Sequence, residues 1–201
     1  QLFSAYLMII AVIVSFFLIA DLKFQKVTLF LLPFFVAALL LIGPVLWLYV
    51  NSAVGGVKIK KSKHLLVPIS FGLVVFILLS LVVVFKKSSV GALLNEVLAA
   101  VTMFAVTVVF VLQNTYYIVH SLSLYKNHQK KVGNVFSYTE QVNLSWLKLL
   151  VYGYLLFIVC LVFSNLLDDV WSYVVFHSVL FSYIVFSGAN ALKHEPVFSI
   201  E

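Results

Sequence analysis

A small set of polar side chains in this sequence could bind a ligand, and each lies in or beside a long apolar segment. Glu96 is the most informative, because an ionisable group in such surroundings usually faces a cavity or a partner. Asn165, Trp171 and His177 belong to two later apolar segments. We predict that these four side chains line a ligand pocket. Each of two residues has an alternative interpretation. Glu96 could complement the helix dipole at the level of the lipid headgroups, and His177 could pack inside the bundle with one hydrogen bond.

A second set follows helical spacing. Gln113, Tyr117 and His120 recur at intervals of four and three residues, which places them on one face of a helix, with Asn114 beside that face. A polar stripe in an apolar helix must point into a bundle. Two interpretations remain open, namely interhelical packing and a relay that carries a signal along the helix.

The third set is the polar stretch 136–148, which separates two strongly apolar blocks. Ser137 and Glu140 fit a capping box, in which each side chain satisfies a backbone N–H of the first helical turn. Phe136, Asn143 and Trp146 complete the candidate residues of this stretch. It is either a plain connector with an interfacial tryptophan or a signal-coupling element.

Catalytic patterns are missing from the sequence. It contains no H-E-x-x-H, no G-x-S-x-G and no phosphate-binding loop, and Cys160 is its single cysteine. We therefore expect a protein that is not an enzyme, with no catalytic residues, no metal site and no cofactor.

Composition indicates which elements position these residues. Hydrophobic residues make up 64% of the 201 residues, charged residues 10%, and the mean hydropathy is +1.15. These values predict an all-α, polytopic integral membrane helix bundle that occupies residues 1–201 as a single domain. Its six expected transmembrane helices are 2–20, 27–50, 65–85, 92–120, 149–166 and 170–192, with a cytoplasmic connector at 126–148.

Gly43 and Pro44 lie in the body of the second expected helix. Proline removes a backbone donor, so we expect a kink at Pro44 and a neighbouring helix that satisfies the freed carbonyl.

Lysine distribution predicts the topology. The sequence has a net charge of +6 and no arginine, and cytoplasmic loops of membrane proteins are enriched in such cations. One set of loops and the C-terminal tail carry Lys58, Lys60, Lys61, Lys63, Lys126, Lys130, Lys131, Lys148 and Lys193. The opposite loops carry only Lys23, Lys26, Lys86 and Lys87. The connector and the C-terminus are therefore expected in the cytoplasm, either as solvated loops or against anionic lipids.

Several short motifs carry a family resemblance. They are Gly43-Pro-Val-Leu-Trp-Leu-Tyr-Val50, His64-Leu-Leu-Val-Pro68, Tyr116-Tyr-Ile-Val, Lys126-Asn-His-Gln-Lys-Lys131, and Phe136-Ser with Glu140 and Asn143-Leu-Ser-Trp-Leu147. From about residue 25 onward the sequence resembles the multi-span sensor domains of membrane-bound AraC-type transcriptional regulators of Bacteroidota.

The resemblance implies a seven-helix sensor in the bacterial inner membrane, followed by a cytoplasmic helix-turn-helix domain that binds DNA. This sequence departs from that pattern because six spans are visible and no helix-turn-helix is present, so DNA could be a partner only through a further C-terminal domain. The other expected partners are the lipid bilayer, a small molecule or membrane protein, and further copies of the chain. A small transporter subunit and a structural subunit of a membrane complex remain the alternative functions.

Overall fold

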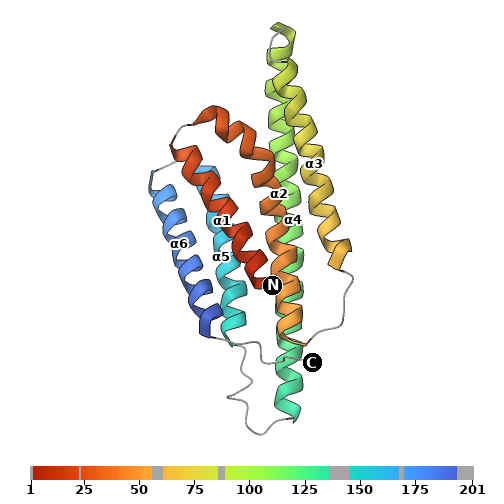
Figure 1. Cartoon of the computed structure of the whole chain (residues 1–201), viewed down its shortest axis with the longest axis vertical. Helices are drawn as coiled ribbons and strands as arrows, with labels where there is room; N and C mark the ends of the chain where they lie inside the picture. The colour runs from red at the N-terminus through yellow and green to blue at the C-terminus, as the bar shows by residue number, and fades with distance from the viewer. Residues whose placement is uncertain are drawn as a thin grey trace. The chain divides into compact units, whose positions relative to one another are not determined.

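The computed structural model describes residues 2–22, 24–55, 61–85, 89–135, 145–167 and 170–193, and this part of the chain is helical with no strand (Figure 1). The helices are α1 (Leu2–Asp21), α2 (Gln25–Ala53), α3 (Lys61–Phe85), α4 (Ser89–Val135), α5 (Ser145–Leu167) and α6 (Val170–Lys193). The all-α prediction is confirmed for these residues, and each expected span corresponds to one helix.

The helix boundaries differ from the predicted ones around the connector. α4 continues to Val135, about ten residues beyond the last apolar turn, and α5 begins at Ser145. At 1.5 Å per residue, the 47 residues of α4 extend for about 70 Å, more than twice a hydrocarbon core. Residues 126–135 of the expected connector are therefore helical, whereas the capping box of Ser137 and Glu140 lies outside the described residues.

Large apolar side chains are exposed on every helix. Met8, Phe30, Phe104 and Phe181 each expose about 70% of their surface. A water-soluble monomer rarely exposes contiguous apolar patches of this extent, but in a bilayer such side chains face lipid tails. Among the described residues, four segments are long and apolar enough to cross a membrane: Leu2–Ala20, Phe30–Ala53, Ala100–Lys131 and Trp146–Phe163.

Several exposed hydroxyl groups on these helices are satisfied within their own helix. Ser15 donates to the carbonyl of Ala11 at 2.8 Å, and Thr107 donates to that of Met103 at 2.9 Å. Such bonds to the carbonyl four residues earlier leave no hydroxyl hydrogen to solvate, so these side chains can face lipid at low cost.

The chain divides into two compact units. Unit 1 comprises Gln1–Leu48 and Lys58–Tyr117, and unit 2 comprises Tyr49–Val57 and Ile118–Glu201. α2 and α4 are each continuous in sequence across this division. The prediction of a single domain stays a prediction.

In unit 1, α2 supplies more buried residues than any other described helix. Its residues from Val36 to Leu48 are almost all buried, which is typical of a helix that is apolar on all sides. α1 packs against it through Phe16 and Phe35, whose rings stack with centroids 4.0 Å apart. α2 is thus the element around which unit 1 is built.

In unit 2, α5 and α6 pack against each other as neighbours along the chain. The rings of Phe157 and Phe176 lie 5.9 Å apart, and both side chains are almost fully buried. Gly153 permits close approach, because a Cβ at this position would lie 2.7 Å from Cδ2 of Tyr183.

α2 ends in a glycine turn. Gly55 has a φ of 67°, in the left-handed region that favours glycine, and its N–H donates to the carbonyl of Ser52 at 3.4 Å. This conformation ends the helix shortly before the lysine-rich segment.

Candidate functional site

The body of α2 contains a proline whose structural cost is offset by α4. Pro44 has no N–H, so the carbonyl of Leu40, four residues earlier, loses its usual helical donor. Nε2 of Gln113 on α4 donates to that carbonyl at 2.8 Å. The expectation that a neighbouring helix satisfies the freed carbonyl is therefore confirmed, and it gives Gln113 a defined structural role.

One residue before this proline, α2 approaches α4 without a side chain between them. A Cβ at Gly43 would collide with Oδ1 of Asn114 and lie 3.3 Å from its Cγ. Asn114 is fully buried, and its Nδ2 donates to the carbonyl of Phe110 at 2.8 Å. Glycine is required here because its missing side chain makes room for a buried polar group.

Three rings meet next to this contact. Nδ1 of His64, on α3, lies 3.2 Å from Oη of Tyr117 on α4, a hydrogen-bonding distance. The Trp47 ring of α2 lies 4.7 Å from the His64 ring and 5.8 Å from the Tyr117 ring, centroid to centroid. Three helices of unit 1 therefore contribute to one group of contacts, which we call the polar cluster: Gly43, Trp47, His64, Gln113, Asn114 and Tyr117.

The polar cluster can hold helices in register and can exchange hydrogen bonds. Trp47 is 8% exposed, and its buried Nε1 has no hydrogen-bond acceptor among the described residues. His64 and Tyr117 can each act as donor or acceptor, so their bond can reverse its direction. The cluster has no carboxylate and no activated nucleophile, and the described residues contain no group of His, Cys, Asp or Glu that could hold a metal ion.

A second aromatic contact joins helix ends in unit 2. Tyr49, on the last turns of α2, lies with its ring centroid 6.0 Å from that of Trp146 on the first turn of α5. Trp146 is 7% exposed. This tryptophan is therefore packed against protein, and its interfacial position stays a prediction.

The predicted coupling stripe on α4 is partly rearranged. Tyr117 is buried and Gln113 half-buried, as expected for a stripe that points inward, but His120 is exposed. The buried face instead follows Phe110, Asn114 and Ser121 with Tyr117. A helix advances 100° per residue, so His120 lies beyond the edge of this face, although its spacing from Tyr117 allowed either placement.

The predicted ligand pocket stays a prediction. Glu96 lies on α4 in unit 1 and Asn165 on α5 in unit 2, and the side chains of both are outside the described set. Trp171 on α6 is 75% exposed. His177 is half-buried, and its ring lies 5.3 Å from that of Phe176 in an edge-on arrangement.

Four of the predicted coupling residues, Phe136, Ser137, Glu140 and Asn143, also lie outside the described residues. Trp47, His64 and Asn114 were not among the predicted site residues, although Trp47 and His64 belong to motifs of the resemblance. The position of Pro44 predicted that a carbonyl in its helix needs a donor from a neighbouring helix. The sequence held no signal that Gln113 would supply it.

In comparisons with known proteins, no family model, no curated protein and no solved structure matches this chain.

Proposed function

We propose that this chain is a membrane-embedded signalling domain of an AraC-type transcriptional regulator. It spans the bacterial inner membrane several times with its C-terminus in the cytoplasm. An envelope or ligand signal reaches the polar cluster and passes along α2 and α4 to a DNA-binding domain outside this chain.

One observation carries the proposal. Residues from four separate motifs of the resemblance make side-chain contacts: Trp47, His64 and Tyr117 in unit 1, and Tyr49 with Trp146 in unit 2. Trp47 and Tyr49 are two residues apart on the continuous helix α2. A change in the His64–Tyr117 contact can therefore act on α2 through Trp47, whose ring lies against both. The same helix carries Tyr49, which contacts the start of α5.

Signalling requires a stimulus that binds two arrangements of these contacts with different affinity. The polar cluster is suited to this because its bonds are directional and reversible, whereas an apolar contact changes little when helices slide. A transporter, in contrast, commonly uses helices that are interrupted near the midplane. α2 passes through Gly43 and Pro44 without a break.

Membrane insertion is tested by cysteine labelling. In a Cys160→Ser background, Ser52→Cys at the end of α2 should react with an impermeant maleimide only after spheroplasts are permeabilised. Leu22→Cys at the end of α1 should react from outside. The reverse pattern, or release of the protein by alkaline carbonate, would contradict the proposed topology or insertion.

Regulation is tested by transcript profiling of strains that carry chromosomal variants. Tyr117→Phe removes the hydroxyl that bonds His64 and should reproduce part of the transcript changes of a deletion strain at an unchanged protein level. Tyr116→Phe is the matched control, because Tyr116 is adjacent and 52% exposed. A deletion without transcript changes would remove the regulator proposal, and a wild-type profile in Tyr117→Phe alone would remove the polar cluster from it.

The sequence encoded beyond Glu201 gives an independent test. About 100 further residues with a helix-turn-helix pattern would support the DNA-binding output. A stop codon at that point would contradict it.

A further inference from the structure

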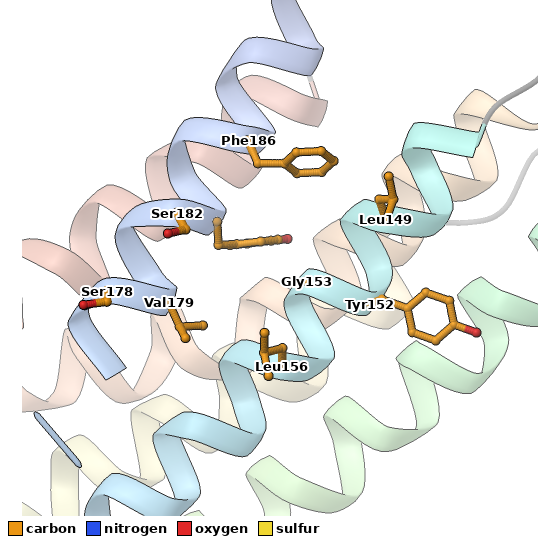
Figure 2. A pocket seen from close by; sticks show the side chains of 9 residues that line it. Leu149, Tyr152, Gly153, Leu156, Ser178, Val179, Ser182 and Phe186 are labelled. Atoms are coloured by element: carbon orange, nitrogen blue, oxygen red, sulfur yellow. The ribbon is translucent and has the colours of Figure 1, made fainter. Parts of the chain in front are cut away.

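A groove runs along α5 and α6 in unit 2 (Figure 2). Its volume is about 550 Å³. Figure 2 shows Leu149 and Phe186 at one end and Leu156 and Val179 at the other. Along α5 these ends are seven residues apart, or about 10 Å.

The lining of the groove is mostly apolar, and much of it is exposed. Leu149 is 56% exposed and Leu156 52% exposed. The hydroxyl of Ser178, also in the lining, donates to the carbonyl of Val174 in its own helix at 2.7 Å. An occupant therefore meets hydrocarbon surface and has no need to hydrogen-bond this serine.

A cation lies beside two residues of this lining, Leu149 and Tyr152. Lys148 is exposed and precedes Leu149 in the first turns of α5. Its Nζ lies 5.7 Å from the centroid of the Tyr152 ring, and Tyr152 itself lines the groove. This cation–π contact places the ammonium group on the outer side of α5, beside the ring of a lining residue (Figure 2).

We infer that the α5–α6 groove binds an anionic phospholipid, with an acyl chain along the groove and the phosphate at Lys148. The inference rests on the proposed membrane insertion, which places the start of α5 at the membrane surface. A phospholipid carries its charge at that depth and its chains parallel to a spanning helix. Charge at one end and hydrocarbon along the rest is the pattern that the groove complements.

A second copy of the chain fits the groove less well. A two-fold symmetric dimer through this face would bring two Lys148 side chains to the same depth, where like charges repel. An anionic lipid instead neutralises this charge.

The experiment is native mass spectrometry of the detergent-purified chain, titrated with phosphatidylglycerol or with phosphatidylcholine of identical acyl chains. The wild type should retain phosphatidylglycerol in preference. Lys148→Gln should weaken that retention about fivefold, since a lysine contributes about 1 kcal/mol near an anionic membrane surface. Lys126→Gln, an exposed lysine on α4, should leave retention unchanged.

The acyl-chain part has its own matched pair. Leu156→Trp fills the groove and should displace both lipids, whereas Leu155→Trp, an adjacent leucine that does not line the groove, should displace neither. The headgroup assignment would be overturned if the wild type and Lys148→Gln each bound phosphatidylglycerol and phosphatidylcholine equally. The groove assignment would be overturned if lipid binding were unchanged in Leu156→Trp. Loss of a dimer instead of lipid in Leu156→Trp would assign the face to a second copy and overturn the inference.

A failure of the lipid-binding inference can be distinguished from a failure of the proposed membrane insertion. Failure of lipid binding in a protein that passes the cysteine-labelling test would remove only the groove assignment. Failure of the labelling test would remove both.

Discussion

Two glycines bring helices together in this molecule, Gly43 on α2 and Gly153 on α5, and the side chains that face them differ in kind. Gly43 faces the carboxamide of Asn114, in a region that also holds the Gln113–Leu40 and His64–Tyr117 hydrogen bonds. Gly153 faces the edge of the Tyr183 ring in an otherwise apolar contact. The same residue type therefore supports a polar contact in unit 1 and an aromatic one in unit 2.

The difference matters because polar contacts in an apolar medium are directional. A buried carboxamide or a freed carbonyl is costly unless its partner stays at a fixed distance and angle. An aromatic ring against a helix can shift by a few tenths of an ångström with little loss. Unit 1 should thus tolerate substitution less than unit 2, and variants at each site can break or sharpen this contrast.

The largest effect is expected at Gly43. Gly43→Ala places a methyl group against the buried Asn114 side chain and should lower the free energy of unfolding by about 3 kcal/mol. The measurement is SDS titration in detergent micelles, followed by circular dichroism. The double variant with Asn114→Ala should lose less than the sum of the single variants, because the shorter side chain makes room for the methyl group. Additive losses would show that the two residues do not contact each other.

A smaller loss is expected at Gln113. Gln113→Leu leaves the Leu40 carbonyl without its donor and should cost about 2 kcal/mol in the same titration. Adding Pro44→Ala restores the intrahelical N–H, so the double variant should recover most of this loss. Gln129→Leu, on the same helix, is the control. Gln129 is exposed, and its Nε2 donates to Oη of Tyr125, a residue of its own helix. No recovery with Pro44→Ala would contradict the pairing of Gln113 with the proline-freed carbonyl.

Gly153 should be more tolerant than Gly43. Gly153→Ala should cost about 1 kcal/mol, because the Tyr183 ring edge can move away from the new methyl group. Gly188→Ala on α6 serves as control, since a Cβ there would meet no atom within 4 Å. That variant should be neutral or slightly stabilising through helix propensity. A loss at Gly153 that equals the loss at Gly43 would remove the proposed contrast between the units.

The smallest effect is expected for a hydroxyl that bonds its own helix. Ser178→Ala removes the bond to the Val174 carbonyl, but that carbonyl keeps its backbone donor. The free energy of unfolding should change by less than about 0.5 kcal/mol in thermal or SDS unfolding. A loss above 1 kcal/mol would show that Ser178 has an interhelical partner that matters for stability.

Composition and the positions of the apolar segments predicted that the described part of the chain is helical, and they located its six helices to within a few residues at most ends. The exception was the end of α4, because a polar helical segment that follows an apolar one carries no hydrophobic signal to mark where it stops. Proline chemistry also predicted from sequence that a carbonyl in α2 would need a donor from a neighbouring helix.

Tertiary structure alone decided which helix supplies that donor and which residues surround it. Trp47, His64 and Tyr117 come from three helices, and no spacing rule relates residues so far apart in the sequence. The exposure of His120 shows the same limit. Helical spacing tells which residues lie on one side of a helix, but it does not tell where the buried side ends. Pairing between helices depends on close packing at small residues such as Gly43, and that geometry exists only once the helices have met.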